Sequence, residues 1–236
     1  MKINEEKDVK EEQAWLLTYA DMMTLLFAFF VLLYSMSSPD PVKASQMQEG
    51  MAESLGMSPE KVDLQSQSEI NETVKEIIEE LDLEGKASIK RDPRGVAMEI
   101  DGDICFGSGS TLLGQTLKDI LDLSTQKILS NANDYRLVVI EGHTDSDPIP
   151  GNLQEIFPSN WELSAARASK VVNYLIDIGV NSGKLQASGY ADRWPAALSW
   201  SEVRGGAVTD AVIFENNKTI EQKRLNRRIK IIFTKN

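Results

Sequence analysis

The sequence is poor in the residues that build covalent staples and metal centres. It has one cysteine and one histidine in 236 residues. The lone Cys105 excludes a disulfide within the chain, and one histidine with one cysteine excludes a zinc-type cluster or a Cys–His nucleophilic pair. We interpret Cys105 as a small buried hydrophobic side chain beside Phe106.

Basic residues are also scarce. Lys and Arg number 25 against 36 Asp and Glu, which gives a formal net charge of −11. No basic stripe offsets this charge, and affinity for nucleic acid depends on cations that neutralise phosphates. We therefore expect no nucleic-acid partner. The length allows one domain of ordinary size plus connecting segments.

Residues 14–36 form a long apolar run that carries a single charge, Asp21. As a helix, this run is long enough to cross a bilayer. A carboxylate at membrane depth costs at least about 2.5–3.5 kcal/mol, so such groups usually mark an ion path or a buried polar partner. A cleaved signal peptide fits poorly, because the run is too long and acidic residues precede it. A plain anchor that tolerates Asp21 is the other alternative.

Small and polar residues share one stripe of this expected helix. Helices in lipid pack closely through such stripes, so Asp21 should face protein rather than acyl chains. Three lysines precede the span, whereas Lys43 alone follows it closely, which favours a cytoplasmic N-terminus. The stripe that includes Asp21 consists of Ala14, Thr18, Thr24 or Leu25, Ala28 and Ser35.

A short amphipathic helix is expected directly after the span, in a segment that we place at residues 38–56. Asp40 followed by Pro41 is typical of a helix start. A solvated juxtamembrane helix and a reversible plug both fit the segment, and its methionines suit a plug because they adapt to irregular surfaces. The apolar stripe consists of Ala44, Met47, Met51, Ala52 and Leu55.

Residues 57–85 are expected to form a linker and a second amphipathic helix that ends near Gly85. The sequence leaves open whether the apolar stripe of this helix packs on the following domain or pairs with a copy of itself. That stripe consists of Ile70, Val74, Ile77, Ile78 and Leu81.

From residue 86 to residue 236 the pattern alternates between strands and helices. A hairpin turn is predicted at 92–95, and Ser159 with Glu162 is a capping box that opens a helix to about residue 178. These elements predict an α+β fold of two layers, in which helices cover one face of a mixed sheet. Strands are predicted at 87–91, 96–100, 137–140, 185–189 and 229–233, a further helix at 112–130, and irregular stretches at 146–158 and 196–225.

A polar ligand site is predicted where the strand at 137–140 ends. Asp145 follows that strand, and Asn160, Ser164 and Arg167 share one face of the next helix. Arg167 can grip a carboxylate with two parallel hydrogen bonds and Asp145 can hold an ammonium, so the pair suits a zwitterionic amino-acid head group. The alternative is a surface salt bridge worth about 0–1 kcal/mol. No activated nucleophile or base accompanies these groups, so we do not expect an enzyme.

Motifs in both parts of the chain carry a resemblance to known families. Gly142-His143-Thr144-Asp145, Asn160–Arg167 and Asn226-Arg227-Arg228-Ile229 resemble the signatures of OmpA/MotB-type peptidoglycan-binding domains. Trp15–Leu26 resembles the membrane helix of the MotB/PomB stator subunits of the bacterial flagellar motor. The resemblance implies an OmpA-like α/β sandwich over residues 86–236. The stretches 146–158 and 196–225 are longer than in the compact domain.

The resemblance also implies a function. Two copies of the chain would pass through a ring of a MotA- or PomA-like membrane subunit in the bacterial cytoplasmic membrane. Each copy would have a cytoplasmic tail at 1–13, one span at 14–37 and a periplasmic C-terminal domain. Asp21 would carry the coupling ion, which is a proton in the first instance or else sodium, and no cofactor is expected.

Roles for further residues follow from the same resemblance. The segment Asp40–Leu55 would be the plug. Asp145 and Arg167 would hold the diaminopimelate end of a peptidoglycan stem peptide. A non-flagellar motor of the same design and a passive envelope tether are the alternatives. Neighbouring site positions would be Thr144, Asn160, Leu163 and Arg228.

Overall fold

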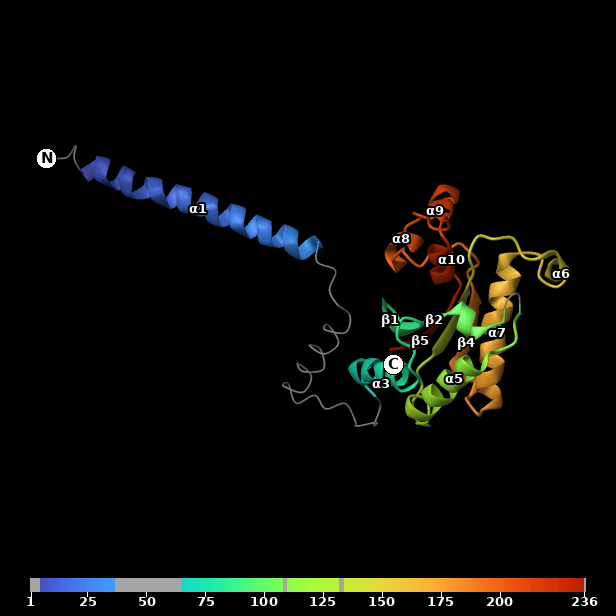
Figure 1. Cartoon of the computed structure of the whole chain (residues 1–236). Coiled ribbons are helices and arrows are strands. Elements are labelled where there is room, and N and C mark those ends of the chain that lie inside the picture. The colour runs from blue at the N-terminus through green and yellow to red at the C-terminus, as the bar shows by residue number, and fades with distance from the viewer. Residues whose placement is uncertain (1–4, 37–64, 108–109, 132–133, 236) are drawn as a thin grey trace. The chain divides into compact units, whose positions relative to one another are not determined.

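A computed structural model describes residues 5–36, 65–107, 110–131 and 134–235. The chain divides into two compact units, Met1–Ala44 and Ser45–Asn236, and each is described by itself (Figure 1). The expected plug at 38–56, with Ala44, Met47, Met51 and Leu55, lies outside the described residues.

The described residues of the first unit form one helix, α1 (Glu5–Met36). It confirms the predicted apolar helix and begins earlier than expected, at Glu5 rather than Ala14. Its window Trp15–Leu32 has a mean hydropathy of 1.8 and is long and apolar enough to cross a membrane. Every side chain in that window is exposed. A helix with this many exposed apolar side chains needs lipid or partner helices to cover them.

The second unit is built on a five-stranded mixed sheet with the strand order β1-β2-β5-β3-β4. β3 and β4 are parallel, and all other neighbours are antiparallel. β5 therefore runs beside β3 in the opposite direction, and His143 at the end of β3 pairs with Arg228 at the start of β5. The strands are β1 (Ala87–Asp92), β2 (Gly95–Asp101), β3 (Val138–His143), β4 (Leu185–Gly189) and β5 (Arg228–Thr234).

The predicted hairpin between β1 and β2 is confirmed, with Asp92 paired to Gly95. Glycine is required at position 95 by close packing, because a Cβ atom there would lie 2.0 Å from the carbonyl oxygen of Phe233. The turn thus fixes the register of the first two strands and lets β5 approach them closely.

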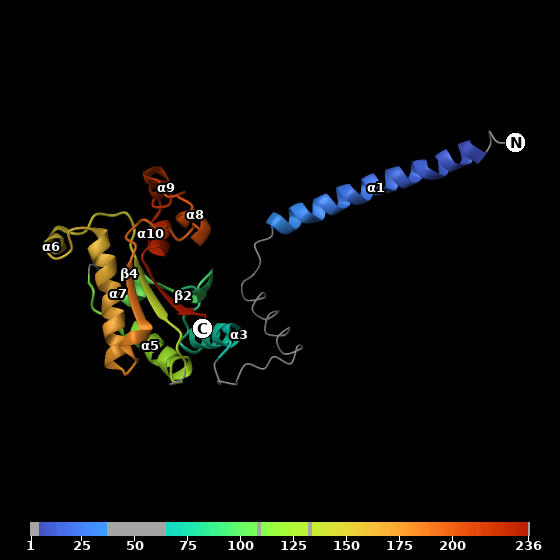
Figure 2. The same cartoon turned by 180° about the vertical axis from the view of Figure 1, so that it is seen from behind.

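Helices α3 (Gln67–Glu80), α5 (Gln115–Lys127) and α7 (Asn160–Asp177) cover one face of the sheet (Figures 1 and 2). This arrangement confirms the predicted two-layer α+β fold. Alternate residues of the strands point towards the helices, as the period of a strand requires. The main core includes Val74, Ile77, Leu117, Ile120, Val171, Leu175, Met98, Ile100, Ile140, Ile229, Ile231 and Phe233.

The apolar stripe of α3 lies in this same core. Ile70, Val74 and Ile77 are completely buried, and burial of each such side chain contributes roughly 1.5–3 kcal/mol. The open question about this helix is therefore answered, because its stripe packs on its own domain. The folded unit includes α3, upstream of residue 86, where the domain was expected to begin.

The opposite face of the sheet is mainly polar and still largely buried. Lys230 Nζ lies 2.8 Å from Asp92 Oδ2, and Arg94 Nη1 lies 2.7 Å from Glu141 Oε1. The indole of Trp194 is buried and covers Lys230, whose Nζ is 5.5 Å from the ring centroid. Buried charges persist in this way only when each has its partner. The segment that follows β4 is therefore part of the fold and not a loose loop.

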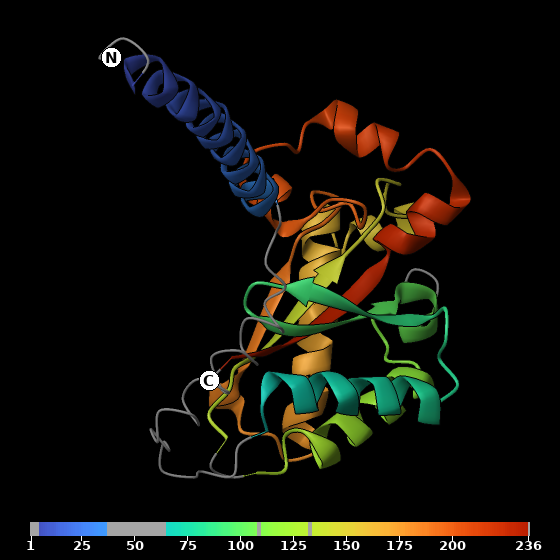
Figure 3. The same ribbon diagram turned by 90° about the vertical axis from the view of Figure 1, so that its left-hand side faces the viewer.

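The stretch at 196–225, expected to be irregular, instead holds three short helices at one end of the sheet (Figure 3). The apolar periodicity does not reveal these helices, because each is two turns long or shorter. Their N-cap residues are visible in the sequence, at Ser199, Thr209 and Thr219. The stretch at 146–158 also holds one helical turn, α6 (Gly151–Gln154). The three helices are α8 (Trp200–Arg204), α9 (Asp210–Glu215) and α10 (Ile220–Asn226).

Candidate functional site

A groove of about 690 Å³ opens where the ends of β3 and β5 meet α4 (Gly102–Cys105) and the first turns of α7. It brings together five of the six predicted site residues of the domain. These are Thr144, Asp145, Asn160, Leu163 and Arg167. Its other lining residues include Asp103, Phe106 and Arg227.

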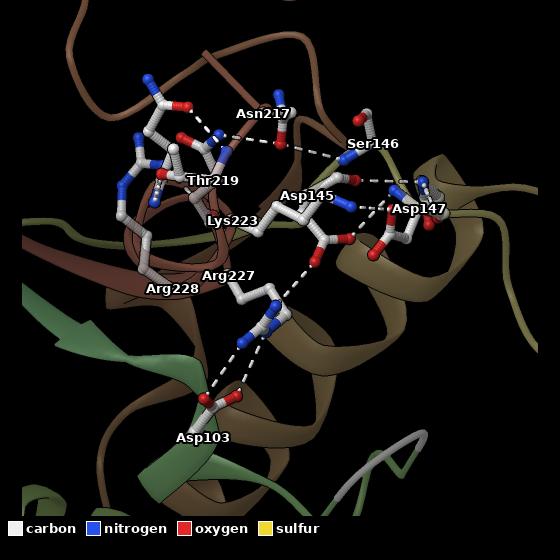
Figure 4. A network of polar contacts seen from close by, with 12 residues as sticks. Asp103, Asp145, Ser146, Asp147, Asn217, Thr219, Lys223, Arg227 and Arg228 are labelled. Carbon is white, nitrogen blue, oxygen red and sulfur yellow. Dashed lines mark hydrogen bonds and ion pairs between the residues drawn. The ribbon is translucent and has the colours of Figure 1, made fainter. Parts of the chain in front are cut away.

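Asp145 is the centre of an ion network in this groove (Figure 4). Its Oδ2 accepts a hydrogen bond from Arg227 Nη1 at 2.8 Å, and its Oδ1 accepts one from the backbone N–H of Asp147 at 3.1 Å. Arg227 also donates to both carboxylate oxygens of Asp103, at 3.1 Å each. The hydrogen bonds to Asp103 and to Asp145 raise the pKa of Arg227 above its usual range. Arg227 thus joins two acidic side chains across the groove.

Arg167 reaches the groove from the second turn of α7. Its Nε donates to the carbonyl oxygen of Ser110 at 3.2 Å, and its guanidinium lies 5.0 Å from the ring centroid of Phe106. Its two terminal nitrogens have no hydrogen-bond partner within the residues that the structure describes. Burial lowers the pKa of Arg167, but arginine stays charged at neutral pH. The side chain is therefore held through Nε, and its two terminal nitrogens, Nη1 and Nη2, are available to donate to a ligand.

The remaining predicted residues shape the groove in different ways. Asn160 Nδ2 donates to the carbonyl oxygens of Asp145 at 3.2 Å and Asp147 at 3.1 Å, so it holds the loop that carries Asp145. Leu163 is buried and supplies an apolar wall. The backbone N–H of Thr144 donates to Ala191 at 2.9 Å, which ties the loop to the end of β4.

Arg228, also predicted at the site, does not line the groove. It is buried on the other side of β5, where Nη2 donates to the carbonyl oxygen of Trp194 at 3.2 Å and Nε lies 3.4 Å from Glu99 Oε1. Arg227 occupies the place expected for Arg228. Asp103 was not predicted at all, because nothing in the sequence places α4 beside the end of β3.

His143 is buried directly before the site residues. Its ring stacks on Tyr190 at 5.4 Å between centroids and meets the edge of Trp194 at 6.1 Å. Neither ring nitrogen has a hydrogen-bond partner in the described part of the chain, although Nε2 lies 3.7 Å from Oε2 of Glu141. Burial lowers the pKa of His143 from 6.5 to about 3. The folded protein therefore keeps this imidazole neutral.

The free energy of unfolding should fall as the pH is lowered from about 6.5 to about 3, because the unfolded chain protonates His143 there and the folded chain does not. Replacing His143 by Phe keeps an aromatic ring and removes the titration, so it should flatten the pH dependence of Tm over this window. The check is thermal unfolding of the full chain in detergent, followed by circular dichroism. Equal slopes for parent and His143→Phe between pH 6.5 and 4 would contradict the assignment.

Asp21 is the one charged residue in the described window Trp15–Leu32 of α1. Thr18 Oγ1 donates to the carbonyl oxygen of Trp15, and Thr24 Oγ1 donates to that of Asp21, both at 2.8 Å. These hydroxyls are satisfied by their own helix. The carboxylate of Asp21 has no hydrogen-bond or ion-pair partner among the described residues. At membrane depth such a group needs a partner from outside its helix.

Two protein families match the two parts of the chain. The MotB plug family, described as membrane MotB of the proton-channel complex MotA/MotB, matches residues 1–55. The OmpA family matches residues 105–207, which include most of the groove. The chain is thus similar to MotB-type proteins that carry an OmpA-like domain.

Relatives of the chain align with it over nearly its full length. The uncharacterized protein YtxE of Bacillus subtilis (strain 168) is 29% identical and aligns with 97% of this chain and 91% of its own length. Motility protein B of the same organism is 26% identical, over 96% of this chain and 92% of its own. The crystal structure of a MotB-like protein from Desulfovibrio vulgaris has the same fold, with a TM-score of 0.55, 20% identity, and coverage of 72% and 94%. The expectation that the chain is no enzyme agrees with these similarities.

Proposed function

We propose that this chain is a stator subunit that couples ion flow through a MotA-type partner to torque, while its OmpA-like domain holds peptidoglycan. The observation that carries the proposal is the combination, in one chain, of a lone membrane carboxylate at Asp21 with a groove that presents Asp145 and Arg167. A tether needs only the groove, and a channel needs only the carboxylate. A motor that works against the wall needs both.

Asp21 is the proposed ion carrier. An oxygen ligand of this kind accepts a proton or holds a hard cation such as sodium. Each elementary charge that crosses the membrane releases about 2.3 kcal/mol per 100 mV, which is the energy available for rotation. The match of residues 1–55 to a family named for a proton-channel complex supports the proton as the coupling ion.

The position of Asp21 also supports a dimer inside a ring of partner subunits. Its carboxylate has no partner within the described residues, and its stripe of small residues suits close packing against other helices. The lysines before the span favour an N-terminus in the cytoplasm. The chain would then cross the inner membrane once and have its C-terminal domain in the periplasm. The driven organelle is the flagellum in this proposal, and the relative named motility protein B supports that choice.

The groove is proposed to hold the diaminopimelate end of a stem peptide. The terminal nitrogens of Arg167, which have no partner among the described residues, suit a carboxylate, and Asp145 suits the ammonium of the same head group. Arg227 keeps its two hydrogen bonds to Asp103 when Asp145 turns to the ligand. The buried side chains of Leu163 and Phe106 can cover the methylene chain. Arg227 therefore replaces Arg228 in the proposed set, which keeps Thr144 and Asn160 as supports.

Deleting residues 40–55 should open an ion leak when the chain is overexpressed with its own MotA-type partner. This segment follows the span directly and lies within the match to the plug family. Cells should grow slowly and their cytoplasmic pH should fall. Adding Asp21→Asn to the deletion should restore growth, because the leak must pass that carboxylate.

The matched control for the plug is deletion of residues 57–64, from the polar linker that follows it. This second deletion should leave growth and cytoplasmic pH unchanged. Unchanged cytoplasmic pH and sodium after deletion of 40–55 would make that segment a spacer. A leak that persists with Asp21→Asn would place the ion path elsewhere and overturn the proposed carrier.

A further inference from the structure

The loop Thr144–Asp147, which carries Asp145, is held from two sides. On one side is Asn160 of α7, which donates to two carbonyl oxygens of the loop. On the other side is the segment that contains α10 (Figure 4). There, Asn217 Oδ1 accepts a hydrogen bond from the backbone N–H of Ser146 at 3.2 Å, and Lys223 Nζ lies 2.6 Å from Asp147 Oδ1.

Asn217 belongs to a buried pair of amides at the centre of that segment. Asn226 Nδ2 donates to Asn217 Oδ1 at 3.0 Å and to the carbonyl oxygen of Asn216 at 2.9 Å. Asn217 Nδ2 donates to the carbonyl oxygen of Ile213, in α9, at 2.8 Å, and Asn226 Oδ1 accepts from the backbone N–H of Ala196. Both side chains are buried. A fully satisfied buried network of this kind is rigid.

The two links from this segment to the loop differ in strength. The pair Lys223–Asp147 is largely exposed, with 28% and 54% of the side chains accessible, and such pairs contribute little. The link from Asn217 to Ser146 starts from a buried, fixed amide, so it can impose a position on the backbone next to Asp145. This makes Asn217 the stronger of the two supports.

We propose that Asn217 is a positioning residue for the groove, which sets the place of Asp145 through the backbone of Ser146 without touching the ligand. The inference rests on the proposed binding of peptidoglycan. This role also explains why the stretch 196–225 is folded, because α9 and α10 hold Asn217 and Asn226 in place. A binding group displaced by about 1 Å loses much of its contribution to recognition.

The test compares three variants of the full chain in detergent. Asn217→Ala removes the acceptor of Ser146 N–H. Asn217→Asp keeps acceptor oxygens for Ser146 and Asn226 and loses the donor to Ile213. Thr209→Val removes the N-cap of α9, whose Oγ1 accepts from Val212 N–H at 3.3 Å, and leaves the amide pair intact. The readouts are pelleting with peptidoglycan sacculi, Tm, and hydrogen exchange of peptides that cover 144–148.

Asn217→Ala should bind sacculi about tenfold more weakly than the parent, because the backbone N–H of Ser146 loses the acceptor that holds the loop in place. Hydrogen exchange at 144–148 should be faster for the same reason. Asn217→Asp and Thr209→Val should lower Tm yet bind as the parent does. Parent-like binding by Asn217→Ala, or equal losses in all three variants, would overturn the positioning role. A parent chain that fails to pellet would overturn the proposed function of the groove, and this role with it.

Discussion

Asp21→Asn should abolish both motility and ion flux, while the protein still inserts into the membrane and recruits its partner. Asparagine has the size of aspartate and forms hydrogen bonds, but it cannot take up and release a proton or hold a cation by charge. The hydroxyls of Thr18 and Thr24 bond within the helix and offer no substitute carboxylate. The expected loss is therefore complete and not graded.

The measurement pairs swimming speed in cells that lack the native copy with ion uptake into vesicles that contain both subunits. Glu12→Gln is the matched control, because Glu12 is a carboxylate of the same helix α1 that precedes the apolar window Trp15–Leu32. It should swim and conduct like the parent. Normal swimming and flux in Asp21→Asn would remove the carrier role and leave a passive tether as the better description. If Asp21→Asn abolishes ion flux but swimming is the same with the parent, with the variant and without either, a non-flagellar motor would be favoured.

Much of the fold could be predicted because local signals agree with the final structure. The capping box Ser159–Glu162 and the apolar stripe after it placed α7 correctly, with its observed start at Asn160. The turn at 92–95 placed the hairpin, and the apolar run from residue 137 placed β3. The stripe of α3 was also visible, but its partner was not, since an amphipathic face has the same pattern whether its own domain or a second copy covers it.

The candidate site was only partly predictable, for a different reason. Asp145 and Arg167 could be named because each follows from a local element, a strand end and a helix face. The choice between Arg227 and Arg228 depends on the antiparallel register of β5 against β3, in which Arg228 pairs with His143. That register is a tertiary property. A shift of one residue exchanges the two faces of a strand, so the sequence alone could not separate the two arginines.

Arg167→Lys should weaken binding to peptidoglycan sacculi on the order of 100-fold, although it conserves the charge. Lysine cannot form two parallel hydrogen bonds with a carboxylate, and it loses the Nε donor that holds Arg167 to Ser110. The apolar core is untouched, because α7 contributes Ala168, Val171 and Leu175 to it and Arg167 is not one of its members. The Tm should therefore stay within a few degrees of the parent.

The matched control is Arg193→Lys. Arg193 is half exposed and pairs with Asp210 at 2.7 Å, and it does not line the groove. This variant has the same chemical change as Arg167→Lys and should pellet like the parent. The comparison separates a general effect of replacing arginine by lysine from the specific effect at the groove.

Asp145→Ala tests the site proposed for the ammonium end of the zwitterion. Removing this carboxylate deletes the acceptor for an ammonium and frees Arg227, which keeps its hydrogen bonds to Asp103. Binding should fall by a similar factor, on the order of 100-fold, if the pair is desolvated in the complex. If only Arg167→Lys lost binding to sacculi, the groove would recognise only the carboxylate of the ligand. Undiminished pelleting of both folded variants would remove these residues from the wall site and direct attention to the segment of α8–α10.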